Sequence, residues 1–169
     1  MKGKGWKSAA PYAALAICAV VSGCGFQLRG SAKLPFESVY IPDNHPMLVE
    51  LSRTLRSGSN AKVVNDPEAA NARFVFLGEH RDKVILSVST SGRIREYQLR
   101  YAIVFRLHDG KGGEYIPTNT VVLRRDITFN EQVLAKETEE VLVYRDMQAD
   151  MVQQIIRRMQ AAKLRLPDD

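Results

Sequence analysis

Cys24 is the residue whose type and spacing point most directly to chemistry. The chain begins with a lysine-bearing segment, which is followed by an uncharged and mostly apolar stretch over residues 9–21. Val21-Ser22-Gly23 then comes directly before Cys24. A membrane-spanning helix needs roughly 20 apolar residues, so this stretch is too short to span and is typical of a secretory leader. The residues before the cysteine form a lipobox, the pattern at which bacterial lipoprotein leaders are cut. We therefore expect removal of residues 1–23 and acylation of Cys24.

The modification at Cys24 also predicts a compartment. An S-diacylglycerol and an N-acyl chain bury enough methylenes to hold a domain on a membrane stably, whereas one chain anchors only reversibly. The next residue is Gly25 rather than the aspartate that commonly retains lipoproteins in the inner membrane. The sequence thus predicts a lipid-anchored protein on the periplasmic side of the outer membrane.

Length, composition and charge limit the class of protein. A chain of 169 residues with 45% hydrophobic and 25% charged residues suits one globular domain and excludes a disordered chain. Only two cysteines are present, which excludes a disulfide scaffold. Losing Lys2, Lys4 and Lys7 with the leader lowers the formal charge from +5 to +2, so nucleic acid is not an expected partner.

Residues that could form a catalytic or metal site are scattered. His45, His80 and His108 have no spacing that would pair them with a nucleophile or a second ligand. Glu139-Glu140 fits a solvated helix surface, and the glycines of residues 110–113 lie between two expected strands, where they cannot form a phosphate loop before a helix. We expect no enzyme, no metal and no cofactor beyond the acyl chains.

Periodicity predicts a strand at residues 38–41, a helix from Pro46 to about Ser57, and then a long β region. Residues 74–77 and 84–89 read as one strand, or as two pieces with a break near residues 78–82. Residues 97–107 alternate strictly between apolar and polar side chains, which indicates a strand with one buried face. A further strand is expected at residues 115–129 and a helix over about residues 131–164.

Ser91-Gly92 fits a two-residue hairpin turn between the two long strands. That turn places Leu86 opposite Tyr97 and Val84 opposite Leu99, on the same face as the aromatic stripe. Continuing this register opposes Asp82 to Tyr101, so we expect a bulge near residues 80–83.

The final helix carries a mostly apolar stripe, and the sheet face opposite the helices is expected to be polar. The stripe consists of Val141, Tyr144, Gln148, Met151, Val152, Ile155, Ile156 and Met159. The polar sheet face is expected to carry Gln98, Arg100, Arg106 and Arg124. These patterns predict an α+β two-layer sandwich in the order β-α-β-β-β-α, with about four mostly antiparallel strands and two helices on one face. We expect a leader at 1–23, a lipidated tether at 24–36, one domain at 37–166 and a tail at 167–169.

Motifs in the mature chain resemble the LptE family of lipopolysaccharide-assembly lipoproteins. The densest is Cys24-Gly25-Phe26-Gln27-Leu28-Arg29-Gly30, followed by Gly92, Glu96-Tyr97-Gln98 and Leu134-Ala135-Lys136. The resemblance implies the sandwich fold. It also implies a role as a plug that stabilises the large outer-membrane β-barrel LptD and assists delivery of lipopolysaccharide to the outer leaflet.

The resemblance further implies contact with lipopolysaccharide, whose phosphates attract arginine and lysine. Arg93, Arg95 and Lys136 are the candidates, with a solubilising surface as the alternative. The family's basic residue before the turn is replaced here by Thr90. The motif residues Gly25, Phe26, Leu28, Arg29 and Gly30 are expected to fit the tether to the barrel rim, or else to serve sorting.

Two other functions stay open at the level of sequence. The first is a lipid-trafficking lipoprotein that binds phospholipid itself, which requires an apolar groove for acyl chains. The second is a periplasmic hydrolase, for which no catalytic arrangement is visible.

Overall fold

The computed structural model describes residues 31–128 and 136–166, and the side chains of the last helix from Glu140 onward. The leader, Cys24 and the motif that follows it lie outside these residues. Within the described chain, no helix is both long enough and apolar enough to cross a membrane.

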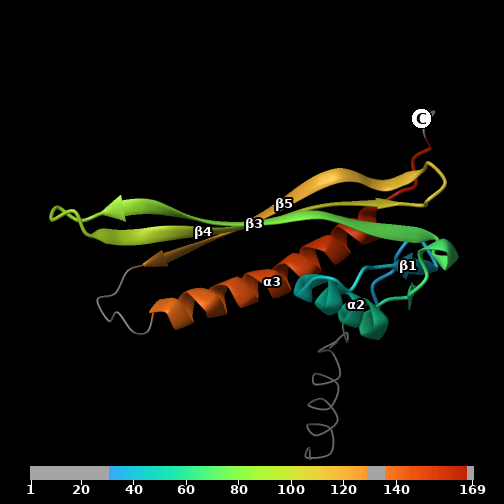
Figure 1. Ribbon diagram of the computed structural model, residues 1–169, viewed down its shortest axis with the longest axis horizontal. Coiled ribbons are helices and arrows are strands. Elements are labelled where there is room, and N and C mark those ends of the chain that lie inside the picture. Colours follow the sequence, from blue (N-terminus) through green and yellow to red (C-terminus); the bar gives the residue numbers. More distant parts are fainter. Residues whose placement is uncertain (1–30, 129–135, 167–169) are drawn as a thin grey trace, which may run out of the picture. The chain divides into compact units, whose positions relative to one another are not determined.

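Five strands form one sheet, and two α-helices and a short 3-10 helix accompany it (Figure 1). The elements are β1 (Ser38–Tyr40), α2 (Pro46–Gly58), β2 (Lys62–Val64), η1 (Pro67–Ala69), β3 (Ala72–Val88), β4 (Ile94–His108), β5 (Glu114–Thr128) and α3 (Lys136–Ala161). The strand order is β2-β1-β3-β4-β5; β1 is parallel to β2 and β3, and the other pairs are antiparallel. The predicted α+β sandwich is therefore confirmed, with one strand more than expected, because β2 is too short to show a period.

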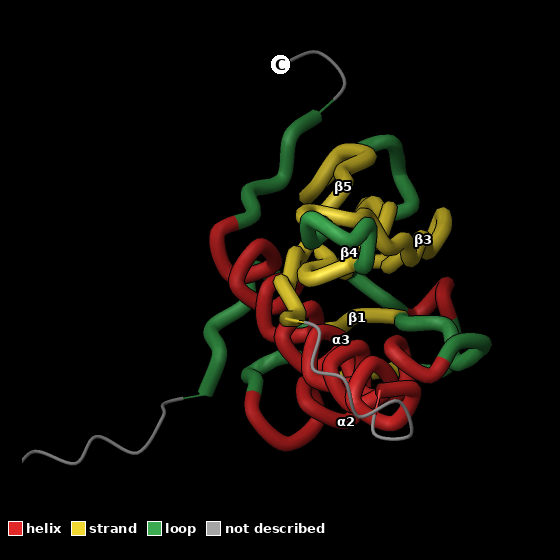
Figure 2. Tube along the Cα trace, turned by 90° about the vertical axis from the view of Figure 1, so that its left-hand side faces the viewer, coloured by secondary structure: helices red, strands yellow, loops and turns green. Residues whose placement is uncertain are grey.

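Helices α2 and α3 lie on the same side of the sheet, as two perpendicular views agree (Figures 1 and 2). On β4, alternate residues from Leu99 to Leu107 face the helices and are buried, whereas the residues between them are half-buried or exposed. The second set includes Gln98, Arg100 and Arg106, and Arg124 of β5 pairs with Arg100. The prediction of one apolar and one polar sheet face is thus confirmed.

The core is one cluster of aliphatic, methionine and aromatic side chains between sheet and helices. Stacked Phe74 and Phe105 lie at its centre, with ring centroids 5.1 Å apart. Leu34 and Phe36, which the sequence placed in the tether, belong to this cluster and are 6% and 4% exposed. The globular packing therefore begins before β1.

The stripe of α3 begins later along the helix than the sequence predicted. Met151, Val152, Ile155, Ile156 and Met159 are buried as expected, and Tyr144 and Gln148 are half-buried. Val141, however, is 66% exposed and was wrongly placed in the stripe. Met147, which was left out, is fully buried. Between Glu140 and Tyr144, α3 thus adds only partly buried apolar side chains, Val143 and Tyr144, to the core.

The hairpin turn between β3 and β4 has three residues, not the two that were predicted. The Ser89 N–H donates to the Arg93 carbonyl at 2.6 Å, which leaves residues 90–92 as the loop. Gly92 adopts φ of 77°, the left-handed conformation that a three-residue loop requires and that glycine adopts without steric cost.

The extra loop residue shifts the register by one, so the predicted cross-strand pairs are wrong. Ile85 rather than Leu86 opposes Tyr97, and Lys83 rather than Val84 opposes Leu99. Because opposed residues share a face, this shift turns Lys83 toward the helices.

The bulges of β3 also differ from the prediction, although the strand runs unbroken from Ala72 to Val88. Pairing skips Leu77 and Leu86, and regular pairs run through residues 80–83, where a bulge was expected. The skipped residue at Leu77 reverses which of the following side chains face the helices. Glu79 therefore opposes Ile103, and Arg81 opposes Tyr101.

Candidate functional site

The hairpin end farthest from α2 carries the sequence-predicted arginines. Arg93 closes the turn, where its N–H donates to the Ser89 hydroxyl at 3.1 Å, and its side chain is exposed. Arg95 is also exposed, two residues before Tyr97 on the same strand. The β3–β4 register passes from Glu96 to Ile94 and skips Arg95, so Arg95 is a bulge residue at the edge of the helix-side face that carries Tyr97.

Two cations of β3 lie beside Tyr97 on the helix-side face of the sheet. We call Arg81, Lys83, Ile85 and Tyr97, together with the adjacent bulge residue Arg95, the distal face. The register pairs Arg81 with Tyr101, Lys83 with Leu99, and Ile85 with Tyr97, which places all three β3 residues on this side. The distal face therefore combines three basic groups with aliphatic and aromatic surface.

Arg81 links the sheet to α3 through aromatic rings. Its guanidinium lies 5.1 Å from the Tyr101 ring centroid and 5.4 Å from that of Tyr144. Its Nε donates to Glu79 at 2.6 Å. Burial disfavours the charged guanidinium, but Glu79 and Tyr101 outweigh that effect and raise the pKa of Arg81. Arg81 is thus fixed as a permanent cation.

Lys83 makes the second link to α3. Its ammonium is paired with the Glu140 carboxylate and lies 4.4 Å from the Tyr97 ring centroid. The hydrogen bond to Glu140 raises the pKa of Lys83. One turn along the helix, the Tyr144 hydroxyl donates to the Asp82 carbonyl at 3.2 Å. At Glu140 and Tyr144, α3 therefore contacts the sheet through an ion pair, a cation–π contact and a hydrogen bond.

Tyr101 brings a buried hydroxyl to the inner edge of the distal face. The residue is fully buried, and its hydroxyl has no hydrogen-bond partner among the described groups. Burial, reinforced by the charge of Glu79, raises the pKa of Tyr101 to about 12. The hydroxyl therefore stays neutral well above physiological pH.

Large aliphatic side chains are exposed around the distal face. Ile85 and Val88 of β3 are 53% and 57% exposed, and Val141 and Leu142 of α3 are 66% and 53% exposed. Isolated exposed aliphatic residues are ordinary, but a group of them beside cations suits a ligand with charged and apolar parts.

Two of the three predicted contact residues have described side chains. Arg93 and Arg95 lie at the hairpin end as expected. Lys136 is the first residue of α3, and its side chain lies outside the described part. Arg81 and Lys83 were not predicted as part of the site, because a two-residue turn places them on the opposite face of the sheet. A three-residue loop that ends in glycine would have predicted the correct register, and with it the face on which both residues lie.

The three histidines have structural partners. His45 caps α2, since its Nδ1 accepts from the Met47 N–H at 3.2 Å while its Nε2 contacts Glu79. His80 lies 3.6 Å from Asp82, and the Nδ1 of His108 accepts from the Gly110 N–H at 3.0 Å. Burial, together with Arg106 and Arg73, lowers the pKa of His108. Within the described residues, no three His, Cys, Asp or Glu side chains could hold a metal ion.

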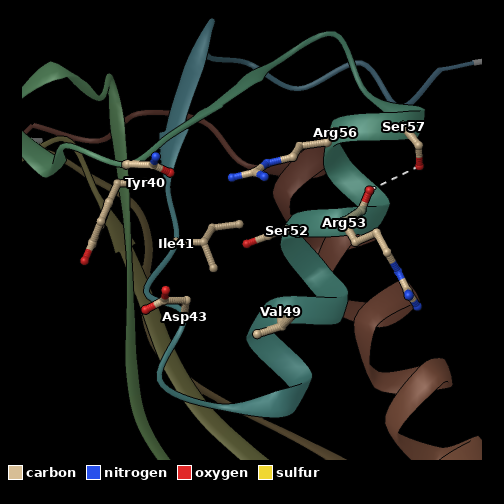
Figure 3. Close-up of a pocket in the computed structure, with 9 residues that line it drawn as sticks. Tyr40, Ile41, Asp43, Val49, Ser52, Arg53, Arg56 and Ser57 are labelled. Carbon is tan, nitrogen blue, oxygen red and sulfur yellow. Dashed lines mark hydrogen bonds between the residues drawn. The ribbon is translucent and has the colours of Figure 1, made fainter.

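A groove of about 680 Å³ lies between α2 and the end of β1 (Figure 3). Ile41 and Val49 give it apolar surface, and Ser52 and Arg56 point into it from the helix. This mixed lining differs from the apolar tunnel that an acyl chain requires.

Known proteins match most of the described chain. A family model described as lipopolysaccharide-assembly, LptE, matches residues 36–159. The LPS-assembly lipoprotein LptE of Pectobacterium atrosepticum is 26% identical over 147 residues, which cover 83% of this chain and 78% of that protein.

Solved structures also share the fold. Lipoprotein B from Nitrosomonas europaea is 42% identical, with a TM-score of 0.68 over 81% of this chain and 91% of its own. Rare lipoprotein B from Shewanella oneidensis is 23% identical and shows the likeness of fold, with a TM-score of 0.62 over 76% of this chain and 94% of its own. Since the family model spans all the described elements from β1 through most of α3, the chain belongs to the LptE family of lipopolysaccharide-assembly proteins.

Proposed function

We propose that the protein is an outer-membrane lipoprotein that fills and stabilises an LptD-like β-barrel and assists lipopolysaccharide assembly. The family match over residues 36–159 is the observation that carries this proposal. The protein acts as a binding and structural partner, without catalysis and without a cofactor. Residues 1–23 are removed, and acyl chains on Cys24 hold the tether that leads to the core residues Leu34 and Phe36 at the periplasmic rim of the barrel.

The sheet supports the role of a plug. The lumen of a large outer-membrane barrel is polar, so its occupant needs a stable apolar core and a polar outer surface. The face of β3, β4 and β5 that lies away from the helices has this character. Arg100 contacts Asp82 at 3.8 Å, and Gln98 donates to Asp126 at 3.0 Å, which leaves Arg106 and Arg124 without partners among the described residues.

The distal face supports contact with lipopolysaccharide. Lipid A combines phosphates with acyl chains, and arginine binds phosphate through its forked donors. Arg81 and Lys83 already have acidic partners, whereas Arg95 has none among the described residues. We therefore assign phosphate contact first to Arg95, and keep Arg93 and Lys136 as the other candidates that the resemblance implies.

Isolation of the full chain from its own outer membrane tests the barrel partnership. After mild detergent extraction, we expect mass spectrometry to find a large β-barrel protein bound in equal amount. Cys24→Ala should give a soluble or uncleaved precursor that recovers much less barrel. Recovery of the acylated protein free of any barrel would contradict the proposal.

Charge reversal tests the lipopolysaccharide contact. Arg95→Glu in the full acylated chain should weaken lipopolysaccharide binding about tenfold or more, because it replaces a charge-assisted hydrogen bond by repulsion. Arg157→Glu is the matched control, since Arg157 is an exposed arginine of α3 outside the distal face. Both variants should keep the parent melting temperature. Equal losses of binding in the two would reduce the contact to nonspecific charge attraction.

A further inference from the structure

We propose that the groove between α2 and the end of β1 binds an extended segment of a partner protein. The segment would place an acidic side chain against Arg56, an aliphatic side chain over Ile41 and Val49, and a basic side chain near Asp43. This docking site is independent of the proposed lipopolysaccharide contact and barrel role, because it uses no residue of the distal face and none of the sheet face that lies away from the helices.

One wall of the groove is a line of side chains on α2. Val49, Ser52 and Arg56 are three and then four residues apart, so they share one side of the helix. This side differs from the buried side, which consists of Met47, Leu48, Leu51 and Leu55. Figure 3 shows the Ser52 hydroxyl and the Arg56 guanidinium directed across the groove toward the strand.

Among the described residues, the polar groups that point into the groove have no polar partner, whereas their neighbours that point away do. The Ser57 hydroxyl donates to the Arg53 carbonyl at 3.2 Å, and Arg53 pairs with Glu50. Ser52 and Arg56 have no polar contact with any described residue. A helical serine normally bonds back to its own helix, so the free Ser52 hydroxyl is available to a ligand.

The opposite wall favours an extended occupant. β2 accompanies β1 only as far as the pair Tyr40–Val64, and the chain then leaves through Asn65. Residues 41–43 follow β1 outside any strand, and no strand of the described chain lies beside them on the β2 side. A segment laid in line with β2 would extend the sheet, which is a common mode of peptide recognition.

The charges of the groove set the pattern of the segment. Arg56 lies at one end, Asp43 lies toward the other, and Ile41 lies between them (Figure 3). Asp43 is exposed and has no described polar partner. Val49 and Arg56 are separated by about 10 Å along the helix, which corresponds to about three residues of extended chain. The matching segment is therefore acidic, then aliphatic, then basic within about four residues.

Arg56 could instead serve only the end of α2, because a cation in the last helical turn stabilises the unpaired carbonyls. That role changes the stability of the helix but gives no preference among peptides. The two roles are thus separable by measuring unfolding and binding on the same variants.

The test uses two blocked peptides and the full acylated chain held in phosphatidylethanolamine nanodiscs. The first peptide is acetyl-Thr-Glu-Val-Leu-Lys-Thr-amide, and the second has its glutamate replaced by lysine. Amide NMR shifts report the site of binding. We expect the parent protein to bind the first peptide about tenfold more tightly, with shifts at Ile41, Val49, Ser52 and Arg56. In Arg56→Glu the preference should reverse, whereas in Arg53→Glu, the matched control, it should persist.

Every other outcome overturns the proposal. Equal binding of the two peptides would reduce the groove to an unspecific apolar surface. Shifts at residues outside the groove, or no shift at several millimolar peptide, would remove the site. A loss of stability in Arg56→Glu with an unchanged peptide preference would leave Arg56 only its role at the end of the helix.

Discussion

The two ends of α3 are held against the sheet by different forces. From Met147 to Met159 the helix buries methionine and branched aliphatic side chains against β4, β5 and α2. Near Glu140 and Tyr144 it is held by an ion pair, cation–π contacts and one hydrogen bond to a strand carbonyl. The first kind of contact excludes water, whereas the second leaves charged groups partly hydrated.

This difference separates stability from recognition. Aliphatic burial contributes most of the folding free energy, because each buried side chain contributes about 1.5–3 kcal/mol. Partly exposed ion pairs contribute about 0–1 kcal/mol each. The distal face can therefore exchange its contacts with a charged ligand at a small cost in stability, while the opposite end keeps the domain folded.

The largest effect is expected from truncating the buried end of α3. Met151→Ala removes a fully buried side chain and should lower the free energy of unfolding by about 2–5 kcal/mol. Val141→Ala on the same helix removes a side chain that is 66% exposed and should change it by less than about 0.5 kcal/mol. Urea unfolding of the full chain measures both. Equal losses would abolish the contrast between the two ends of the helix.

The apolar core that stabilises the fold could be predicted well from the sequence. The alternation of residues 97–107 placed one face of β4 correctly, and the spacing of Leu48, Leu51 and Leu55 predicted α2. These patterns can be read from the sequence because an element with one buried face repeats apolar side chains at its own period, which is two residues in a strand and about 3.6 in a helix. Strand β2 could not be found in this way, since three residues, one exposed and two half-buried, carry no period.

The second-largest effect is expected from the buried hydroxyl of Tyr101, which lies on β4 at the inner edge of the distal face. Its pKa is raised from 10.0 to about 12 in the folded protein. As the pH rises, Tyr101 loses its proton in the unfolded chain before it does so in the folded protein. The contribution of the neutral hydroxyl to the free energy of unfolding is therefore complete below pH 10 and is lost between pH 10 and 12. That loss amounts to about 2–3 kcal/mol. Tyr101→Phe should abolish this part of the pH dependence.

Unfolding of the parent protein and of Tyr101→Phe at pH 9 and pH 11.5 measures this difference. Tyr115 and Tyr144 also have raised pKa values because of burial, and they contribute equally to both proteins. The difference between the two proteins therefore isolates Tyr101. At pH 9 the variant should be as stable as the parent or more so, because the hydroxyl that it loses has no described partner. Parallel pH profiles would show that the hydroxyl finds a partner that stabilises its anion.

The site was harder to predict than the fold because one loop residue decides it. Composition showed arginines near the hairpin end, but their face depends on whether the turn has two or three residues. The same reasoning failed for Val141, whose spacing fits the stripe of α3 although the sheet residues near it are charged. Periodicity describes one element at a time, whereas burial depends on what lies opposite.

The smallest effect is expected from the polar link at the distal end. In a double-mutant cycle, Lys83→Ala and Glu140→Ala should show a coupling energy of about 0.2–1 kcal/mol, because the two side chains are 39% and 33% exposed. Arg125 and Asp150 form a more exposed pair, at 55% and 50%, and should couple less. Both coupling energies should decrease in 1 M salt, since screening then acts over about 3 Å. A coupling of several kcal/mol between Lys83 and Glu140 would mean that the distal end of α3 is held as firmly as its core end, and that a ligand could not displace it at small cost.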